Sequence, residues 1–210
     1  MSNRKYEQSL RAEAAEDTRR RILGALRSQL SAEPSRPVRV EHVARLARVA
    51  RPTVYTVFGS RAGLFDALGA ELLHRGGFDQ LTEAAADPDA RRGLRNGIEG
   101  VCALYAGDRD VFRALYSMAQ LDAEAVAGAV QRLEDQRVAC MNDVAQNLEA
   151  QGLLREGVTV DRAADALWML TSFDAFDLLY TGRSLSASDA AAAISLAANG
   201  ICYLQASPLR

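Results

Sequence analysis

Lysine and histidine are scarce in this 210-residue chain, which contains one lysine and two histidines. Because Lys5 is the only lysine, any other cation that meets an anionic partner must be an arginine. His42 and His74 have no acidic partners at metal-ligand spacing, and no Ser/His/Asp order indicates a nucleophilic site. We therefore expect no catalytic residue, no metal and no cofactor, and an enzyme is the least favoured hypothesis.

Cysteines are few and widely separated, and long apolar runs are lacking. None of the three cysteines, Cys102, Cys140 and Cys202, has the C-x-x-C spacing of a metal or redox site, so we expect buried, inert thiols. No apolar run approaches the roughly 18 residues that cross a bilayer. The charged N-terminus also lacks the apolar centre of a secretory signal. We expect a cytoplasmic protein with no membrane partner.

Charge is divided unevenly, although the net charge is only −2 and the pI is about 5.8. Residues 1–61 contain 13 Lys and Arg against 6 Asp and Glu. Residues 62–210 contain 12 against 21. A basic head on an acidic body is typical of a chain whose first part binds a polyanion.

The stretch VEHVARLARVARPTVYTVF, residues 40–58, has the pattern of two short helices joined by a tight turn. Val40, Val43, Ala44 and Ala47 recur at helical spacing, so a helix is predicted over 40–47. Residues 48–50 form the turn, and the chain restarts with proline in the first helical turn, where its missing N–H costs nothing. Two hypotheses fit: a helix-turn-helix that binds DNA, or an ordinary helical hairpin with a solvated face.

The flanking motifs favour the first hypothesis. TRRRIL, VEHVARLA, PTVYTVF and SRAGLF occur in the order and spacing of the N-terminal domain of the TetR family of transcriptional repressors. The run from Asp17 to about Phe78 resembles that domain. The rest resembles the family only in being helical and of suitable length. The resemblance implies a homodimer that binds a palindromic or nearly palindromic DNA operator and is released by a small-molecule effector held among the body helices.

Candidate DNA contacts follow from the outward face of the second helix and from the resemblance. Arg51 and Thr56 are expected at base edges, with Arg51 able to select guanine through O6 and N7. By resemblance, phosphate-contacting positions are Thr18, Thr53, Tyr55 and Arg61. Arg61 stands where the family usually has lysine, and arginine keeps the charge while adding a fork suited to phosphate oxygens.

Three positions depart from the family pattern. Arg39 and Ala50 stand where the family usually has a capping Ser or Thr, and Arg48 stands where the turn usually carries Gly. The missing caps cost about 1 kcal/mol each. A left-handed Arg48 would add about 1 kcal/mol of strain. Either the head has drifted and lost DNA binding, or Arg39 and Arg48 supply phosphate contacts. We favour phosphate contact, because both changes bring in charge that DNA attracts.

The whole chain is predicted to be all-α. We expect an arm and three-helix helix-turn-helix head over 1–60, a connecting helix over 61–78 that ends at Gly76-Gly77, and a larger ligand-binding and dimerisation body over 79–210. Residues 1–16 could be an arm or an extension of a first helix capped by Asp17 or Thr18. Ser60 should cap the connecting helix, and Gly59 should close the preceding helix in the left-handed conformation. Body helices are expected near 89–106, 108–119, 122–151, 159–181 and 187–206.

Two groups of body residues are candidate sites. Aromatic and sulfur-bearing side chains, which are core by default, could also line an apolar effector cavity: Cys102, Tyr105, Phe112, Tyr116, Met141, Trp168, Met169, Phe173 and Phe176. Small and apolar residues of the last helix, which a partner subunit or the chain's own core must cover, are candidates for the dimer interface: Ala190, Ala193, Ile194, Ala197 and Ile201. A helical ligand-binding or adaptor protein without specific DNA binding is the main alternative function.

Overall fold

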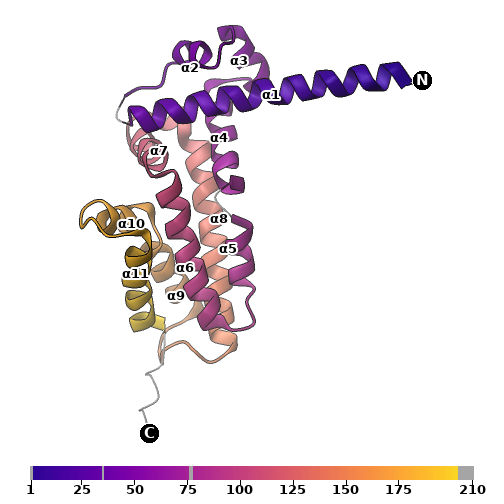
Figure 1. The fold of residues 1–210 in the computed structure, drawn as a ribbon. Helices are drawn as coiled ribbons and strands as arrows, with labels where there is room; N and C mark the ends of the chain where they lie inside the picture. The colour runs from indigo at the N-terminus through magenta and orange to yellow at the C-terminus, as the bar shows by residue number, and fades with distance from the viewer. Residues whose placement is uncertain (1, 35, 76–77, 203–210) are drawn as a thin grey trace. The chain divides into compact units, whose positions relative to one another are not determined.

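The computed structural model describes residues 2–34, 36–75 and 78–202, and within them the side chains of 8–34, 36–75, 82–122 and 124–200. This part of the chain forms eleven α-helices and no strand (Figure 1). The all-α prediction is therefore confirmed. None of these helices combines the length and the apolar character that crossing a membrane requires. The expected joint at Gly76-Gly77 lies outside the described residues.

Helix α1 (Ser2–Ala32) is one continuous helix of 31 residues. The prediction that a helix starts at a cap on Asp17 or Thr18 is wrong, because both side chains bond within α1. The Thr18 hydroxyl donates to the Ala14 carbonyl at 2.8 Å, and Asp17 pairs with Arg21 at 3.2 Å. Of the two alternatives for residues 1–16, the helical extension is confirmed from Ser2 onward, since that stretch is rich in helix-forming residues.

The helix-turn-helix has the expected bounds. Helix α2 (Val40–Leu46) and helix α3 (Arg51–Phe58) are separated by a short turn, as the apolar spacing predicts. Their inward side chains, Val43 and Val54, are buried, as are Ile22 and Leu26 of α1. Burial of such side chains, at about 1.5–3 kcal/mol each, holds the short helices in place. The buried side chains of α1, α2 and α3 therefore fix α3 in place and leave its polar face exposed.

A tight corner joins α3 to helix α4 (Arg61–Arg75). Gly59 has φ +74° and ψ −49°, and the Ser60 amide donates to the Phe58 carbonyl at 2.9 Å, which makes a γ-turn. The prediction of positive φ is confirmed, but the left-handed helical conformation is not. Ser60 caps α4 as expected, since its hydroxyl accepts from the Gly63 amide at 2.9 Å. A Cβ on Gly63 would lie 2.2 Å from the Phe58 carbonyl oxygen, so only glycine fits there.

The chain divides into two compact units that are not contiguous in sequence. The first unit comprises Met1–Glu71 and Asp110–Val130, and the second comprises Leu72–Arg109 and Gln131–Arg210. Helix α7 (Arg109–Leu121) contributes almost wholly to the first unit, where Phe112 and Leu115 are buried. The expected boundary near residue 78, between a DNA-binding part and an effector-binding and dimerisation part, remains a prediction.

The second unit contains helices packed around α6. Helix α6 (Ala90–Gly107) contacts α5 (Phe78–Ala85) and α11 (Ala187–Cys202), while α11 also contacts α9 (Val160–Leu170) and α10 (Phe173–Tyr180) (Figure 1).

Helix α8 (Ala123–Ala150) contributes to both units. The single helix expected over 159–181 is two helices, because Ser172 caps α10 by accepting from the Ala175 amide at 3.1 Å. The Thr171 hydroxyl also closes α9 by donating to the Leu167 carbonyl at 2.7 Å.

Candidate nucleic-acid interface

The exposed face of α3 has the side chains predicted for DNA contact. Arg51 and Thr56 are exposed, Thr53 and Tyr55 are half-buried, and Val54 points into the core at 1% exposure. The Thr56 hydroxyl donates to the Pro52 carbonyl at 3.0 Å. A short helix with polar side chains outward and one apolar anchor inward can lie in a major groove without losing its own packing.

Arg51, at the start of α3, is held on more than one side. Its Nε lies 2.8 Å from Glu41 Oε1, and its Nη2 donates to the Tyr55 hydroxyl at 3.4 Å. The guanidinium carbon also lies 5.3 Å from the centre of the Tyr55 ring. Glu41 was not among the residues predicted for this surface, because the sequence shows only an opposite charge ten residues before Arg51.

The turn between α2 and α3 is a Schellman motif with arginine in the place that glycine usually takes. Arg48 has φ +55°, its amide donates to the Arg45 carbonyl at 3.1 Å, and the Val49 amide donates to the Ala44 carbonyl at 3.0 Å. Arg48 therefore adopts the left-handed conformation that glycine takes readily, with the strain that this brings. The turn thereby exposes a cation directly before α3.

The two helix starts lack side-chain caps, as the sequence indicates. Neither Arg39 before α2 nor Ala50 before α3 makes a capping hydrogen bond. Both residues are exposed, and the first-turn amides that donate do so to the Arg39 and Ala50 backbone carbonyls.

Arginines near Thr18 connect α1 to the helix-turn-helix. Arg21 Nη1 donates to the Ala47 carbonyl at 3.3 Å, and Arg21 Nη2 donates to the Thr18 hydroxyl at 3.4 Å. Arg19 lies over the Phe58 ring, with its guanidinium carbon 4.9 Å from the ring centre. The Arg21–Ala47 and Arg19–Phe58 contacts could not be predicted from local sequence, because they join residues 26 and 39 positions apart.

Arg61, the predicted phosphate contact at the start of α4, is already paired within the first unit. Its Nη1 lies 2.7 Å from Asp122 Oδ2, and its guanidinium carbon lies 5.5 Å from the Phe65 ring centre. The two partners are 61 residues apart, so no local pattern predicts them. A phosphate that bound Arg61 would compete with the Asp122 carboxylate.

The residues expected to line an apolar cavity lie in both compact units. The Tyr105 ring packs on those of Phe173 and Phe176, with ring centres 5.4 and 5.6 Å away, and all three are buried. Phe112 and Tyr116 belong to the first unit, whereas the other members belong to the second. Aromatic side chains in a helical bundle serve as core, and the assignment of this set to an effector cavity stays a prediction.

Other members of that set are either buried thiols and thioethers or surface residues. Cys102 and Met141 are buried, whereas Trp168 and Met169 are 41% and 60% exposed. Burial raises the pKa of the Cys102 thiol to about 12 and that of Cys140 to about 11, with nearby carboxylates adding to both effects. The thiols therefore stay protonated at neutral pH, as expected of inert cysteines. Cys202 lies outside the described side chains.

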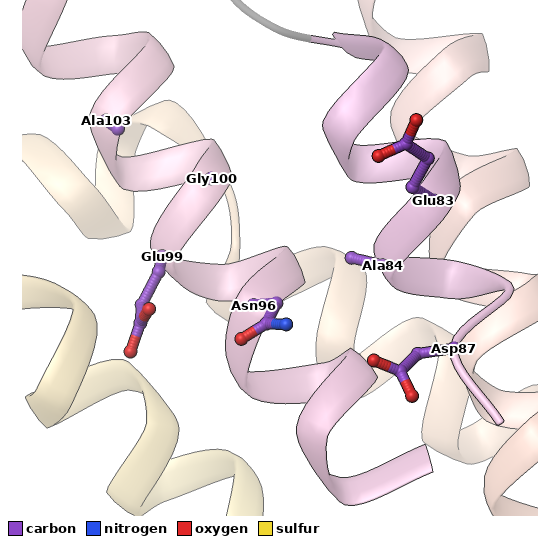
Figure 2. Close-up of a pocket in the computed structure, with 7 residues that line it drawn as sticks. All are labelled: Glu83, Ala84, Asp87, Asn96, Glu99, Gly100 and Ala103. Carbon is purple, nitrogen blue, oxygen red and sulfur yellow. The ribbon is translucent and has the colours of Figure 1, made fainter. Parts of the chain in front are cut away.

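Hollows in the second unit include two that are lined wholly by described residues. The larger, about 520 Å³, is acidic and lies between α5 and α6 (Figure 2). Its lining residues are Glu83, Ala84, Asp87, Asn96, Glu99, Gly100 and Ala103. The smaller, about 190 Å³, is lined by Val138, Asn142, Ala164, Asp165 and Trp168. Of the predicted pocket residues, Trp168 is the one that lines either of these two.

Asp87 in the larger hollow is engaged by Arg92. The two side chains are linked at 2.7 and 2.8 Å, and this pairing holds the pKa of the Asp87 carboxyl below its usual range. Among the described residues no cluster of histidine, cysteine and carboxylate side chains is arranged to hold a metal ion.

Helix α11 divides the predicted dimer residues between two faces. Ala190 and Ile194 are 0% and 3% exposed within their own chain, so the prediction that a partner covers them is wrong. They fill the packing of α11 on its neighbours. Ala193 is half-buried and Ala197 exposed, beside Leu196 at 74% exposure. The Ile201 side chain lies outside the described residues.

The fold is shared with solved transcriptional regulators. NalD, the secondary repressor of the MexAB-OprM multidrug efflux pump in Pseudomonas aeruginosa, is 25% identical, with a TM-score of 0.67 over 90% of this chain and 98% of that chain. A TetR family regulator from Marinobacter aquaeolei is 15% identical, with a TM-score of 0.68 over 92% and 100%. A TetR-like regulator from Rhodococcus is 22% identical, with a TM-score of 0.63 over 86% and 93%.

No protein-family profile and no curated protein matches the sequence. The likeness to these regulators is therefore one of fold and of N-terminal motifs. The structural likeness extends over about nine tenths of the chain, and the helix-turn-helix motifs form the expected helices. The chain has the fold of TetR-family transcriptional regulators.

Proposed function

We propose that this protein is a homodimeric repressor that binds a palindromic or nearly palindromic DNA operator through α3 and releases it when a small molecule binds the helical body. The observation that carries the proposal is the outward face of α3, where Arg51 and Thr56 are exposed beside an arginine-bearing turn. A buried Val54 anchors this face from behind. Exposed donors on a rigidly packed helix are what reading a major groove requires.

Each candidate contact has a distinct task in this proposal. Arg51 and Thr56 reach base edges, and Arg51 selects guanine through O6 and N7. The other candidates bind phosphate and fix the register of the protein on the duplex. They are Thr18, Arg39, Arg48, Thr53, Tyr55 and Arg61. Arg61 exchanges its Asp122 partner for a phosphate when DNA binds.

The homodimer matches the two half-sites of a palindrome, whose centres lie about 34–36 Å or a multiple apart. We propose that the outer face of α11, with Ala193, Leu196 and Ala197, contributes to the interface. Ala197→Arg should give monomers in sedimentation and abolish most specific DNA affinity. Ala127→Arg, on an exposed position of α8, should leave the dimer intact. Dimers of unchanged strength with Ala197→Arg would locate the interface elsewhere.

An apolar or amphipathic effector is proposed for the body. NalD is described as the repressor of a multidrug efflux pump, which makes drug-like compounds a sensible first panel. Trp168 is the only tryptophan and lines the 190 Å³ hollow, so its fluorescence should report binding there. Compounds that release DNA with unchanged affinity after Trp168→Phe would exclude this hollow as the effector site.

Selection of bound sites from a random duplex library tests the whole proposal. A regulator should enrich one palindromic sequence, and an effector should abolish that enrichment when selection is repeated in its presence. Enrichment of no sequence would favour a ligand-binding or adaptor protein instead. Gel retardation of random duplex DNA at low salt is a cheaper test. Retardation is expected of a DNA-binding regulator and is not expected of an enzyme. The proposal assigns no catalytic step, metal or cofactor to the chain.

A further inference from the structure

Glu41 is an acidic residue within the surface proposed to face DNA. It lies in the first turn of α2, and its Oε1 is 2.8 Å from Arg51 Nε. Both side chains are exposed, Arg51 at 55% and Glu41 at 62%. Arg51 is additionally restrained by the Tyr55 hydroxyl at 3.4 Å and by the Tyr55 ring. The guanidinium is therefore held between α2 and the next turn of α3.

Stability gives little reason for this pair, because exposed ion pairs contribute almost nothing to folding. General DNA affinity gives a reason against it, because a carboxylate repels the phosphate backbone and cancels one cation. What the ion pair can do is hold the Arg51 side chain in one orientation. A long arginine side chain that is restrained before binding loses less rotamer freedom when it meets its base.

The remaining donors of Arg51 match guanine. A guanidinium has five N–H groups, of which Glu41 and Tyr55 each engage one. Three remain, and recognition of guanine O6 and N7 needs two. A move of Arg51 away from the base towards a phosphate would leave Glu41 unpaired against the DNA. The pair therefore favours one placement of Arg51 and penalises another.

On the basis of the DNA-binding function proposed above, we propose that Glu41 is a positioning residue that holds Arg51 for guanine and thereby sharpens the preference for one base pair in each half-site. Glu41 acts through Arg51 and does not itself bind the base. It gives up general affinity for DNA in exchange for discrimination between bases.

Glu41→Gln tests this by changing two measured quantities in opposite directions. Affinity for random duplex DNA should rise and become more salt-dependent, because one negative charge is removed from the interface. Discrimination for guanine at the Arg51 position should fall about 2- to 10-fold, which corresponds to the cost of immobilising one side chain. Both should be measured on full-length protein, by titration at several salt concentrations and by site selection.

Glu33→Gln is the matched control, since Glu33 pairs with Arg36 at 2.7 Å beyond the end of α1 and has no contact with Arg51. It removes the same charge and should leave discrimination unchanged. In an Arg51→Ala background, Glu41→Gln should cause no further loss of discrimination, because there is no arginine left to orient. Melting temperatures of all variants separate a general loss of folding from a loss at one base pair.

The outcomes separate this inference from the function on which it rests. If the unaltered protein enriches no sequence, the proposed function fails and the inference fails with it. If the protein enriches an operator but Glu41→Gln leaves discrimination intact, the inference alone is wrong. Discrimination that improves in Glu41→Gln would show that Glu41 withholds Arg51 from DNA, which also overturns the positioning role.

Discussion

The two compact units differ in where their candidate functional side chains lie. In the first unit the candidate DNA contacts lie on α1, α3 and α4 and directly before α2 and α3, and two of them are paired, Arg51 with Glu41 and Arg61 with Asp122. In the second unit Tyr105 and Phe176 are buried and packed on each other. A DNA-contacting surface is encoded by turns and exposed charges, whereas an effector cavity cannot be distinguished from core by residue type.

The largest effect should come from the core of the second unit. Phe176 is fully buried, with ring neighbours Tyr105 at 5.6 Å and Tyr180 at 5.0 Å. Phe176→Ala should lower the free energy of unfolding by about 3–5 kcal/mol, because it leaves a cavity that its neighbours fill only in part. Urea denaturation followed by circular dichroism measures the change.

Met169→Ala is the control on the same unit. Met169 is 60% exposed, so its replacement should change stability by no more than about 0.5 kcal/mol. Were Phe176→Ala equally harmless, the aromatic cluster would be the wall of a solvent-filled cavity. The contrast between the two units would then disappear.

The next largest effect concerns the proposed base contact. Arg51→Ala should cost about 1–3 kcal/mol at the preferred base pair and relax selection at that position only. Thr53→Val should weaken all sequences about equally, because the Thr53 hydroxyl is assigned to phosphate. Site selection with both variants measures the difference. Unchanged selectivity after Arg51→Ala would move Arg51 to the phosphate-binding class.

The sequence predicted some features well because they depend on neighbouring residues. The turn at Arg48 follows from a short apolar spacing, and the start of α3 follows from Pro52 in its first turn. The continuity of α1 was missed because Asp17-Thr18 resembles a cap, although both side chains bond within the helix.

The remaining features depend on residues far apart in the chain. Asp122 neutralises Arg61 across 61 positions, and no local pattern indicates which carboxylate a given arginine will meet. Helix α11 is apolar on several faces, but only the fold decides that Ile194 is covered by its own chain. Side-chain type therefore predicts that a residue is buried, whereas only the tertiary structure shows which other residues cover it.

A smaller effect should follow from releasing Arg61. Asp122→Asn removes the carboxylate that pairs with Arg61 at 2.7 Å and keeps a side chain of nearly the same size. We expect up to about 1 kcal/mol lower stability and a gain of similar size in DNA affinity, since phosphate no longer competes with Asp122. Fluorescence anisotropy on operator DNA measures the gain.

Asp135→Asn is the matched control, because it removes the same charge from the second unit, where Asp135 accepts from Gln131 at 2.7 Å. Its effect on DNA affinity should be negligible. An Asp122→Asn protein that binds DNA no better than the parent would remove Arg61 from the set of phosphate contacts.

The smallest effect should come from the turn before α3. Arg48 has φ +55°, so Arg48→Gly should relieve up to about 1 kcal/mol of strain and raise the melting temperature. If Arg48 contacts phosphate, the same change should weaken DNA binding and lower the salt slope by about 1 per subunit. Ala50→Ser is the control, because it adds the missing cap of α3 and should stabilise the protein by about 1 kcal/mol with nearly unchanged affinity. Stabilisation by Arg48→Gly with equal or better DNA binding would mean that the turn merely tolerates arginine. The departures at Arg39, Arg48 and Ala50 would then indicate drift in the first unit, and its arginines could no longer be assigned to DNA from their exposure alone.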